Sequence, residues 1–370
     1  MKKILVIAPY TYLPYQSGGQ KLIAQFTEEL GAQSELYVVS TIKNDASKVK
    51  NYELVKWLNA SFLRYLDVSL IHKIRGLISI KQSEIIIWEH PYFAWLAFII
   101  KKFTGIKTII HTHNIEFDRF KSTGRWWWPI LKLYEKWCFS IADKITFITT
   151  EDKRFAQQLW NIPESKCLIM PYGIPFSAMP SNRKEARDQV AALHNIDPHE
   201  KILLFNGALD YAPNQEAIQY IINEINPLLK RTELNYKILI CGKDLPDSIK
   251  EQENFKHSNI IYAGFVRDID LYSMSADVLL NAVQSGGGIK TKLVEAIGFG
   301  ANVVSTRTGA QGVNADYCNG KLSIVPDNDW ESFSDEVVRL SNFNIDTPVS
   351  FYQEFYWGSI VKRLLEDLAN

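Results

Sequence analysis

The 370-residue sequence has few cysteines, no long apolar run and no excess of charge of either sign. Its four cysteines are far apart and form no Cys-x-x-Cys pair, which excludes a disulfide framework or a cysteine zinc site and favours a reducing compartment. The longest apolar stretch, residues 92–100, is too short to span a bilayer, which needs about 20 residues. We therefore expect a soluble protein of the cytoplasm.

The zero net charge, from 41 basic and 41 acidic residues, argues against a dedicated nucleic-acid-binding protein. The charge is unevenly distributed, however, because residues 1–170 carry 23 Lys and Arg against 15 Asp and Glu. This half therefore has a net charge of +8 and the remainder has −8. A basic half could contact an anionic surface, such as the inner face of the cell membrane. Ordinary fluctuation between domains would produce the same asymmetry.

Composition and length point to a globular protein of two domains. With 46% hydrophobic and 12% aromatic residues, the chain is neither disordered nor of low complexity. Its length exceeds the size at which single cores stop growing. Short apolar runs alternate with segments of helical period, the pattern of doubly wound parallel sheets. The predicted strands are 4–8, 35–40, 85–88, 108–111, 144–148, 166–170, 202–205, 237–241, 260–263, 278–281 and 302–305.

A proline- and glycine-rich stretch predicts the domain boundary. We expect one domain over residues 1–172, a linker over 173–182, a second domain over 183–348, and a C-terminal helical segment, 349–370, that packs back on the first domain. The clearest predicted helix starts at Pro213 and places isoleucines on one face.

The glycine-rich segment 285–296 carries the clearest chemical signal. It follows a predicted strand and opens a helix, where glycines permit close backbone approach and free N–H groups attract phosphate. Lys290 and Lys292 add positive charge, and the carboxylate of Glu295, one turn beyond Lys292, could accept two sugar hydroxyls. The alternative is a flexible loop with a surface ion pair. We interpret the segment as an anion site, although it is neither a Walker P-loop nor a Gly-x-Gly-x-x-Gly motif.

Four motifs in order resemble those of family 4 glycosyltransferases, and the resemblance covers most of the chain. They are GG at 18–19, HNIE at 113–116, FNGALDYAPN at 205–214, and GGGIKTKLVEA at 286–296 with GANVVST at 300–306 and GAQG at 309–312. The resemblance implies a GT-B fold, an α/β architecture of two Rossmann-like domains whose parallel sheets face each other across a cleft. It implies that the first domain binds the acceptor and the second binds the nucleotide-sugar.

The same resemblance implies retention of anomeric configuration, with no metal and no cofactor beyond the nucleotide-sugar substrate. It suggests His113, Lys292 and Glu295 as catalytic candidates, Glu295 holding the nucleotide ribose and Lys292 the diphosphate. The implied donor-binding residues are Gly18, Gly19, Gly207, Val266, Gly287, Gly288, Ile289, Lys290, Lys292 and Glu295. Two positions depart from the family pattern: Gly287 stands where many relatives have a glutamate, and 208–210 lack an Arg and a Lys.

His111 and His113 are two residues apart at the end of a predicted strand, so both point to one face. Three interpretations remain open. They could contact the donor sugar or the acceptor, as the resemblance suggests for His113, with His111 and Glu116 as acceptor contacts. They could ligate a metal with Glu116, although no fourth ligand is evident. They could also be structural histidines.

A tryptophan-rich segment follows, with basic residues interspersed among Trp126, Trp127 and Trp128. This mixture suits a membrane interface or an acceptor contact, and plain packing is the alternative. Three adjacent tryptophans cannot all face one core, so we expect some to be exposed.

These observations predict a cytoplasmic glycosyltransferase that moves a hexose-type sugar from UDP or GDP to a glycan or lipid-linked glycan precursor. Its expected partners are the nucleotide-sugar, the acceptor and an anionic membrane surface, without nucleic acid. Two alternatives remain open. A sugar-nucleotide 2-epimerase would use the same architecture, and the departures from the family pattern at 208–210 and Gly287 would also fit a non-catalytic subunit that binds nucleotide-sugar. The few carboxylates of the first domain and its tryptophans count against the epimerase.

Overall fold

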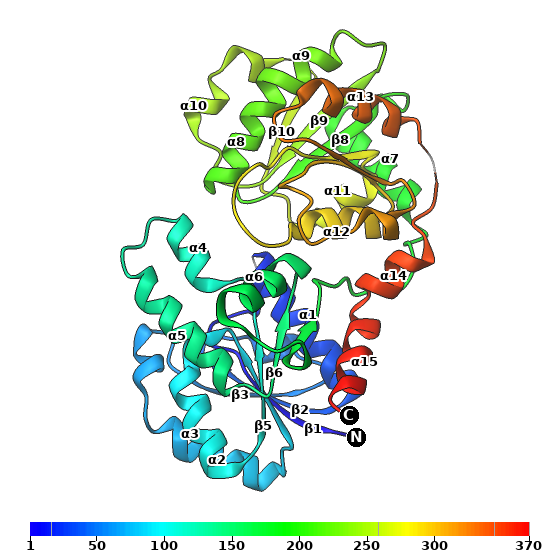
Figure 1. Ribbon diagram of the computed structural model, residues 1–370. Coiled ribbons are helices and arrows are strands. Elements are labelled where there is room, and N and C mark those ends of the chain that lie inside the picture. Colours follow the sequence, from blue (N-terminus) through cyan, green and yellow to red (C-terminus); the bar gives the residue numbers. More distant parts are fainter. Residues whose placement is uncertain (16, 258, 344, 370) are drawn as a thin grey trace. The chain divides into compact units, whose positions relative to one another are not determined.

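The computed structural model describes residues 1–15, 17–257, 259–343 and 345–369 (Figure 1). Its contacts divide the chain into two compact units, Met1–Pro175 with Tyr356–Asn370, and Phe176–Phe355. Each unit has its own parallel sheet and its own hydrophobic core. The chain therefore leaves the first unit once and returns to it at its end.

The first unit is built on a seven-stranded parallel sheet with the order β3-β2-β1-β4-β5-β6-β7. The strands are β1 (Lys3–Ile7), β2 (Glu35–Thr41), β3 (Glu53–Leu58), β4 (Ile85–Glu89), β5 (Lys107–His111), β6 (Lys144–Phe147) and β7 (Cys167–Ile169). Because β1 pairs with both β2 and β4, the winding reverses between β1 and β4. Ligands of open α/β sheets bind beyond the carboxyl ends of the strands at such a reversal.

Helices connect these strands and bury their apolar faces on the sheet. They are α1 (Gly18–Gln33), α2 (Leu70–Lys81), α3 (Ala94–Thr104), α4 (Glu116–Ser122), α5 (Trp128–Ile141) and α6 (Thr150–Trp160), with short 3₁₀ turns at Ala46–Lys48, Phe62–Leu66, Pro91–Phe93 and Glu164–Lys166. The last helix, α15 (Trp357–Asp367), packs on α1, where Trp357 Nε1 donates to Gln25 Oε1 at 3.1 Å.

The second unit contains a six-stranded parallel sheet with the order β10-β9-β8-β11-β12-β13. The strands are β8 (Lys201–Asn206), β9 (Tyr236–Cys241), β10 (Ile260–Gly264), β11 (Val278–Asn281), β12 (Asn302–Thr306) and β13 (Leu322–Val325). The helices are α7 (Arg183–His194), α8 (Ala212–Tyr220), α9 (Asn226–Leu229), α10 (Asp247–Lys250), α11 (Ile269–Ser275), α12 (Thr291–Gly298), α13 (Trp330–Ser341) and α14 (Val349–Phe355), with 3₁₀ turns at Glu253–Lys256 and Ala315–Cys318. Here the winding reverses between β8 and β11.

The two doubly wound sheets confirm the predicted α/β fold class, and each predicted strand overlaps an observed one. The prediction missed β3 and β13, which are edge strands with exposed or half-buried positions. Their mixed polarity does not read as a continuous apolar run, which is typical of central parallel strands. The segment that we expected over 349–370 is divided, because α14 belongs to the second unit and α15 to the first.

The helix predicted from Pro213 forms, with Pro213 in its first turn, but it is not regular. A π-helical turn, Ile221–Ile225, separates α8 from α9. Pro227, in the first turn of α9, has no N–H to donate, which explains why α-helical pairing is interrupted there. The isoleucines of this segment are nevertheless buried in the core of the second unit.

Two features of the chain bear on its environment. Among the described helices, none is both long enough and apolar enough to cross a bilayer. The four cysteines are buried and unpaired, in agreement with the spacing that argued against disulfides.

Candidate functional site

Except for Val266, the predicted donor-binding residues of the second unit lie near the winding reversal of its sheet. Gly207 directly follows β8, and residues 287–290 belong to the loop between the neighbouring strand β11 and helix α12. The parallel strands bring these two connections to the same edge of the sheet. The motif at 205–214 and the glycine-rich segment are therefore neighbours in space.

Lys290 folds back over the glycine loop. Its Nζ donates to the carbonyl oxygens of Gly286, Gly287 and Gly288 at 2.7, 3.3 and 3.1 Å. Gly286 and Gly288 have φ values of 81° and 75°, in the left-handed region that favours glycine. Lys290 therefore stabilises the curved loop as well as adding positive charge.

Lys292 has a buried ammonium group. Its Nζ lies 4.0 Å from the centroid of the Phe205 ring and donates to the carbonyl oxygen of Asn206 at 3.1 Å and to Asn214 Oδ1 at 3.4 Å. Burial, together with the charge of Lys290, lowers the pKa of Lys292 to about 7. No salt bridge joins it to a carboxylate among the described residues. A buried cation without a counter-ion is costly, so this position favours an anionic ligand.

Unpaired polar atoms accompany this lysine. Asn206 is the last residue of β8, and Gln284 lies three residues after β11. Asn206 Oδ1 and Gln284 Nε2 are buried and have no hydrogen-bond partner in the structure. Such atoms are rare and call for an explanation, for example a bound ligand. Gly207 is required by packing, because a Cβ there would lie 2.7 Å from Asn214 Nδ2. The glycine thus allows Asn214 to reach Lys292.

The remaining predicted donor residues are less closely grouped. Glu295 lies one turn beyond Lys292 on α12 and is 8% exposed. Ile289 is half-buried in the loop before α12. Val266 follows the edge strand β10, which is separated from β8 by β9. The structure therefore groups the glycine loop, Lys292 and Gly207, and it places Val266 farther along the sheet edge.

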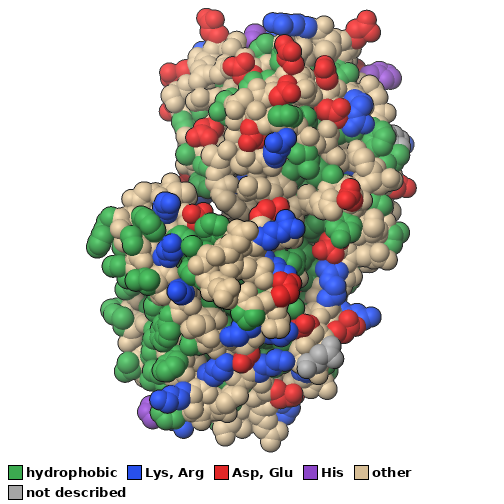
Figure 2. All heavy atoms as spheres, in the orientation of Figure 1, with side chains coloured by type: hydrophobic (Ala, Val, Ile, Leu, Met, Phe, Trp, Pro, Cys, Tyr) green, Lys and Arg blue, Asp and Glu red, His purple; other side chains and the backbone are tan. Residues whose placement is uncertain are grey.

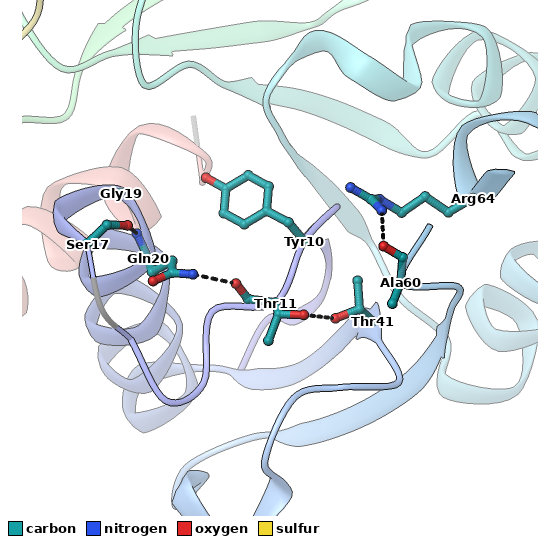
Figure 3. A pocket seen from close by; sticks show the side chains of 8 residues that line it. All are labelled: Tyr10, Thr11, Ser17, Gly19, Gln20, Thr41, Ala60 and Arg64. Atoms are coloured by element: carbon teal, nitrogen blue, oxygen red, sulfur yellow. Dashed lines mark hydrogen bonds between the residues drawn. The ribbon is translucent and has the colours of Figure 1, made fainter. Parts of the chain in front are cut away.

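In the first unit, Gly18 and Gly19 begin α1, the next element of the chain after β1, whose carboxyl end lies at the winding reversal. A cavity of about 430 Å³ opens there (Figure 3). It is lined by Tyr10, Thr11, Ser17, Gly19, Gln20, Thr41, Ala60 and Arg64. A Cβ on Gly19 would lie 3.8 Å from the Tyr10 hydroxyl and meet no other atom within 4 Å. This glycine therefore keeps the space beside the hydroxyl open.

His111 and His113 come together on Glu89, the last residue of β4. His111 Nδ1 donates to Glu89 at 3.0 Å and His113 Nε2 donates at 2.7 Å. Burial alone would raise the pKa of Glu89, but the two histidines outweigh it and lower that pKa, so the carboxylate stays ionised. These distances are those of hydrogen bonds, whereas ligands on a tetrahedral zinc would stand roughly 3.3 Å apart. We therefore assign the three side chains to a hydrogen-bonded network.

Glu116 does not join His111 and His113, so the grouping that we considered for a metal site is wrong. Its Oε1 instead accepts from His90 Nδ1 at 3.0 Å, and its Oε2 accepts from Tyr92 at 2.7 Å and from Arg119 Nη2 at 2.7 Å. Burial opposes ionisation, but His90 and Arg119 lower the pKa of Glu116 to about 2. Glu116 is therefore a buried, fully paired carboxylate.

The three adjacent tryptophans differ in exposure, as expected. Trp126 is 82% exposed, whereas Trp127 and Trp128 are half-buried and pack against the core of the first unit. On α5, Ile130 and Leu133 are also exposed, and Figure 2 shows hydrophobic side chains gathered on this face with basic groups beside them. We call Ile130 and Leu133, together with Trp126 just before the helix, the apolar surface of α5.

The sequence analysis missed Tyr10, Glu89, His90, Tyr92 and Arg119. Tyr10 follows β1, while Glu89 and His90 stand where β4 ends, so the rule that ligands bind beyond strand ends could have indicated them. Tyr92 carried no such signal, because only folding brings it to Glu116. Arg119 lies three residues after Glu116, so the i,i+3 spacing of a helix could have indicated this pair.

Comparison with known proteins identifies the family. The model for Glycosyltransferase Family 4 matches residues 16–177, and the model for Glycosyl transferases group 1 matches residues 200–342. Together they cover most of the chain, which therefore belongs to the family 4 glycosyltransferases and has their GT-B fold.

Particular relatives are distant in sequence. A Klebsiella pneumoniae protein described as an uncharacterized 44.6 kDa protein in cps region is 23% identical over 96% of this chain and 97% of its own. Anabaena Alr3699/HepE in complex with UDP is 13% identical with a TM-score of 0.72, covering 99% of both chains. A Rickettsia africae glycosyltransferase is 14% identical with a TM-score of 0.73, covering 100% of this chain and 99% of that one.

Proposed function

We propose that this glycosyltransferase moves a sugar, with retention of configuration and without a metal ion, from a UDP- or GDP-sugar to a glycan or lipid-linked glycan. The acceptor would be a precursor of a surface polysaccharide, modified at the cytoplasmic face of the membrane. The observation that carries the proposal is Lys292, a buried cation beside a glycine loop at the carboxyl ends of β8 and β11. A diphosphate supplies the negative charge that this position lacks.

The chemistry follows from where charge develops. In glycosyl transfer, the sugar becomes oxocarbenium-like while negative charge grows on the departing diphosphate. Lys292 and the first N–H groups of α12 are fixed positive groups that stabilise this charge without reorganisation. They would provide the neutralisation that a divalent cation provides in metal-dependent transferases. The proposal assigns no residue as a covalent nucleophile.

Two relatives support the choice of substrates. Anabaena HepE has the same fold and binds UDP, and the Klebsiella relative is described by its cps region. For the membrane, the apolar surface of α5 lies among Lys121, Arg125 and Lys136, in the basic half of the chain. Aromatic and aliphatic side chains among basic groups suit an anionic lipid surface.

The test is a thermal-shift panel of UDP, GDP, ADP and their common sugars, with and without a chelator. We expect one nucleotide to raise Tm selectively, with no effect of the chelator. The product of the selected donor is then analysed by NMR for anomeric configuration. The absence of any shift, or a shift abolished by the chelator, would contradict the proposal.

A further inference from the structure

Three side chains from separate segments of the first unit form a hydrogen-bonded chain that is partly buried at Tyr10 and buried at His90 and Glu116. The Tyr10 hydroxyl lies 2.7 Å from His90 Nε2, and His90 Nδ1 lies 3.0 Å from Glu116 Oε1. A carboxylate only accepts hydrogen bonds, so His90 Nδ1 carries a hydrogen and donates it. In the neutral ring, Nε2 is then bare and accepts the hydrogen of Tyr10. The order of donation is therefore fixed from Tyr10 to Glu116.

The backbone holds His90 in an unusual conformation for this contact. His90 has φ 66° and ψ 163°, a region that residues other than glycine rarely adopt and that costs about 1–3 kcal/mol. Its N–H donates to the carbonyl oxygen of His111 at 2.9 Å, which ties it to the neighbouring strand. The fold thus directs the imidazole of His90 to Tyr10 and Glu116 at a cost in stability.

The charged and titratable groups around His90 favour a neutral ring that can take up a proton. Burial and the His113 ring, whose centroid lies 4.0 Å away, lower the pKa of His90, and the Glu116 carboxylate partly opposes this. Tyr92 stacks on the imidazole at 5.1 Å. The other charged groups nearby are Glu89 and Arg119, the latter on Glu116. Glu116, kept ionised, would stabilise an imidazolium once it forms.

The Tyr10 end of this hydrogen-bonded chain faces the cavity described above. Tyr10 lines it, and Figure 3 shows its hydroxyl directed toward the start of α1, where Gly19 leaves space. Because the hydrogen of Tyr10 is engaged with His90, its oxygen can only accept a hydrogen bond from a ligand. The lining side chains include hydroxyl groups, one amide and one guanidinium, with no carboxylate. Such a cavity is suited to a hydroxyl-bearing ligand.

We propose that Tyr10 takes the proton of the acceptor hydroxyl bound in this cavity and that His90 relays it, with Glu116 as its counter-charge. The inference rests on the proposed transfer reaction. The acceptor oxygen forms a bond to the anomeric carbon as the bond from that carbon to the diphosphate oxygen breaks, and the electron pair leaves with the diphosphate. The acceptor proton moves to the Tyr10 oxygen while the Tyr10 proton moves to His90 Nε2. After transfer, His90 returns this proton through Tyr10 to water.

Tyr10 is the catalytic residue of this relay, and His90 and Glu116 are positioning residues. The test uses the full chain, the sugar nucleotide selected by the thermal-shift panel, and water as the acceptor, with released nucleoside diphosphate measured. Tyr10→Phe removes one hydroxyl, and we expect kcat to fall by about 10²-fold, the lower end for general acid–base catalysis. The donor-induced Tm shift should be unchanged, because Tyr10→Phe alters neither Gly18 and Gly19 nor any donor-binding group of the second unit. Tyr52→Phe, which removes a hydroxyl group that is hydrogen-bonded to the Tyr12 hydroxyl, is the matched control and should keep wild-type kcat.

The pH profile separates a relay from a structural role. In the wild type, kcat/KM should fall on the acid side as His90 becomes protonated, and Tyr10→Phe should lose this limb. Glu116→Gln should lower kcat and leave donor affinity unchanged. Wild-type kcat, or a retained acid limb, in Tyr10→Phe would overturn the relay while leaving the transferase intact. If the wild type itself releases no nucleotide from any donor, the transfer reaction fails, and the relay fails with it.

Discussion

The ammonium group of Lys292 lies over the ring of Phe205, with 4.0 Å between Nζ and the ring centroid. An aromatic face is attractive to a cation but does not neutralise it. The carbonyl oxygen of Asn206 and the amide oxygen of Asn214 supply partial charges only. The charged form of Lys292 therefore lacks a full counter-charge within the protein, and an anionic ligand would supply it.

Replacing Lys292 should separate stability from binding. In Lys292→Met, the cost of burying the ammonium disappears, so we expect a Tm at least equal to that of the wild type. Donor affinity should fall about 10- to 100-fold, because a charge-assisted contact is worth about 1.5–3 kcal/mol. Calorimetry with the selected UDP- or GDP-sugar measures this, and Lys230→Met, at an exposed lysine of the same unit, is the control. Undiminished donor affinity in Lys292→Met would refute the diphosphate role.

Donor binding should also depend on pH through Lys292. Its pKa is about 7 in the folded chain, so the fraction carrying a charge rises as the pH falls through that value. The diphosphate of a sugar nucleotide stays fully ionised in this range, and donor affinity should therefore increase from about pH 8 to about pH 6. Lys292→Met should show no such dependence. An equal dependence in both proteins would assign the effect to another group.

Two adjacent glycines should respond differently to alanine. Gly286 has a φ of 81°, and a Cβ there would lie 2.9 Å from the Tyr211 hydroxyl, so Gly286→Ala should lose about 1–2 kcal/mol of stability. A Cβ on Gly287 would meet no atom within 4 Å, so Gly287→Ala should keep the wild-type Tm. Its methyl group would project into space proposed for the donor, and affinity should fall about tenfold. Wild-type donor affinity in Gly287→Ala would place the diphosphate elsewhere.

The apolar surface of α5 should contribute to membrane binding. Trp126, Ile130 and Leu133 are exposed, so a triple change to serine should leave Tm unaffected. Sedimentation with vesicles containing phosphatidylglycerol should be strong for the wild type, weaker in high salt, and largely lost in the triple variant. Phe265→Ser, at an exposed aromatic residue of the second unit, is the control. Equal binding to purely zwitterionic vesicles would argue against an anionic surface.

The buried carboxyl of Glu135 should make the stability of the first unit depend on pH. Burial raises the pKa of Glu135 to about 8, although the N–H groups of Glu116 and Phe117 that it accepts partly oppose this. Since this pKa is raised, the stabilising contribution is complete below about pH 4.5 and is lost as the pH rises to about 8. The stability difference between the wild type and Glu135→Gln should therefore decrease over this range, by about 1.4 kcal/mol for each unit of pKa shift.

Urea unfolding followed by tryptophan fluorescence measures this difference, because every tryptophan except Trp330 belongs to the first unit. Glu151→Gln, at an exposed glutamate of the same unit, is the control for the substitution itself. Parallel curves for the wild type and Glu135→Gln would contradict the prediction.

The glycine loop and the lysines of the second unit could be predicted closely because their sequence signals are local. Glycines, a helix start and two lysines stand within one segment, and the chain needs only a strand before it and a helix after it to present them. The sequence did not reveal that Lys290 donates to the loop carbonyls, whereas Lys292 donates to the carbonyl oxygen of Asn206 at the end of β8. That difference depends on which side of α12 faces β8.

The amino-acid sequence by itself determined the α/β class, most of the strands, the glycine loop and the resemblance to family 4, because these depend on composition, period and contiguous motifs. Only the tertiary structure decided the hydrogen-bonded network of the first unit. Glu89 and His111 are partners in the register of β4 and β5, although 22 positions separate them in the chain. Tyr10 meets His90 because β1 and β4 are neighbours in the sheet. Strand order and register arise from the packing of the whole sheet, and so these contacts cannot be read from any single segment.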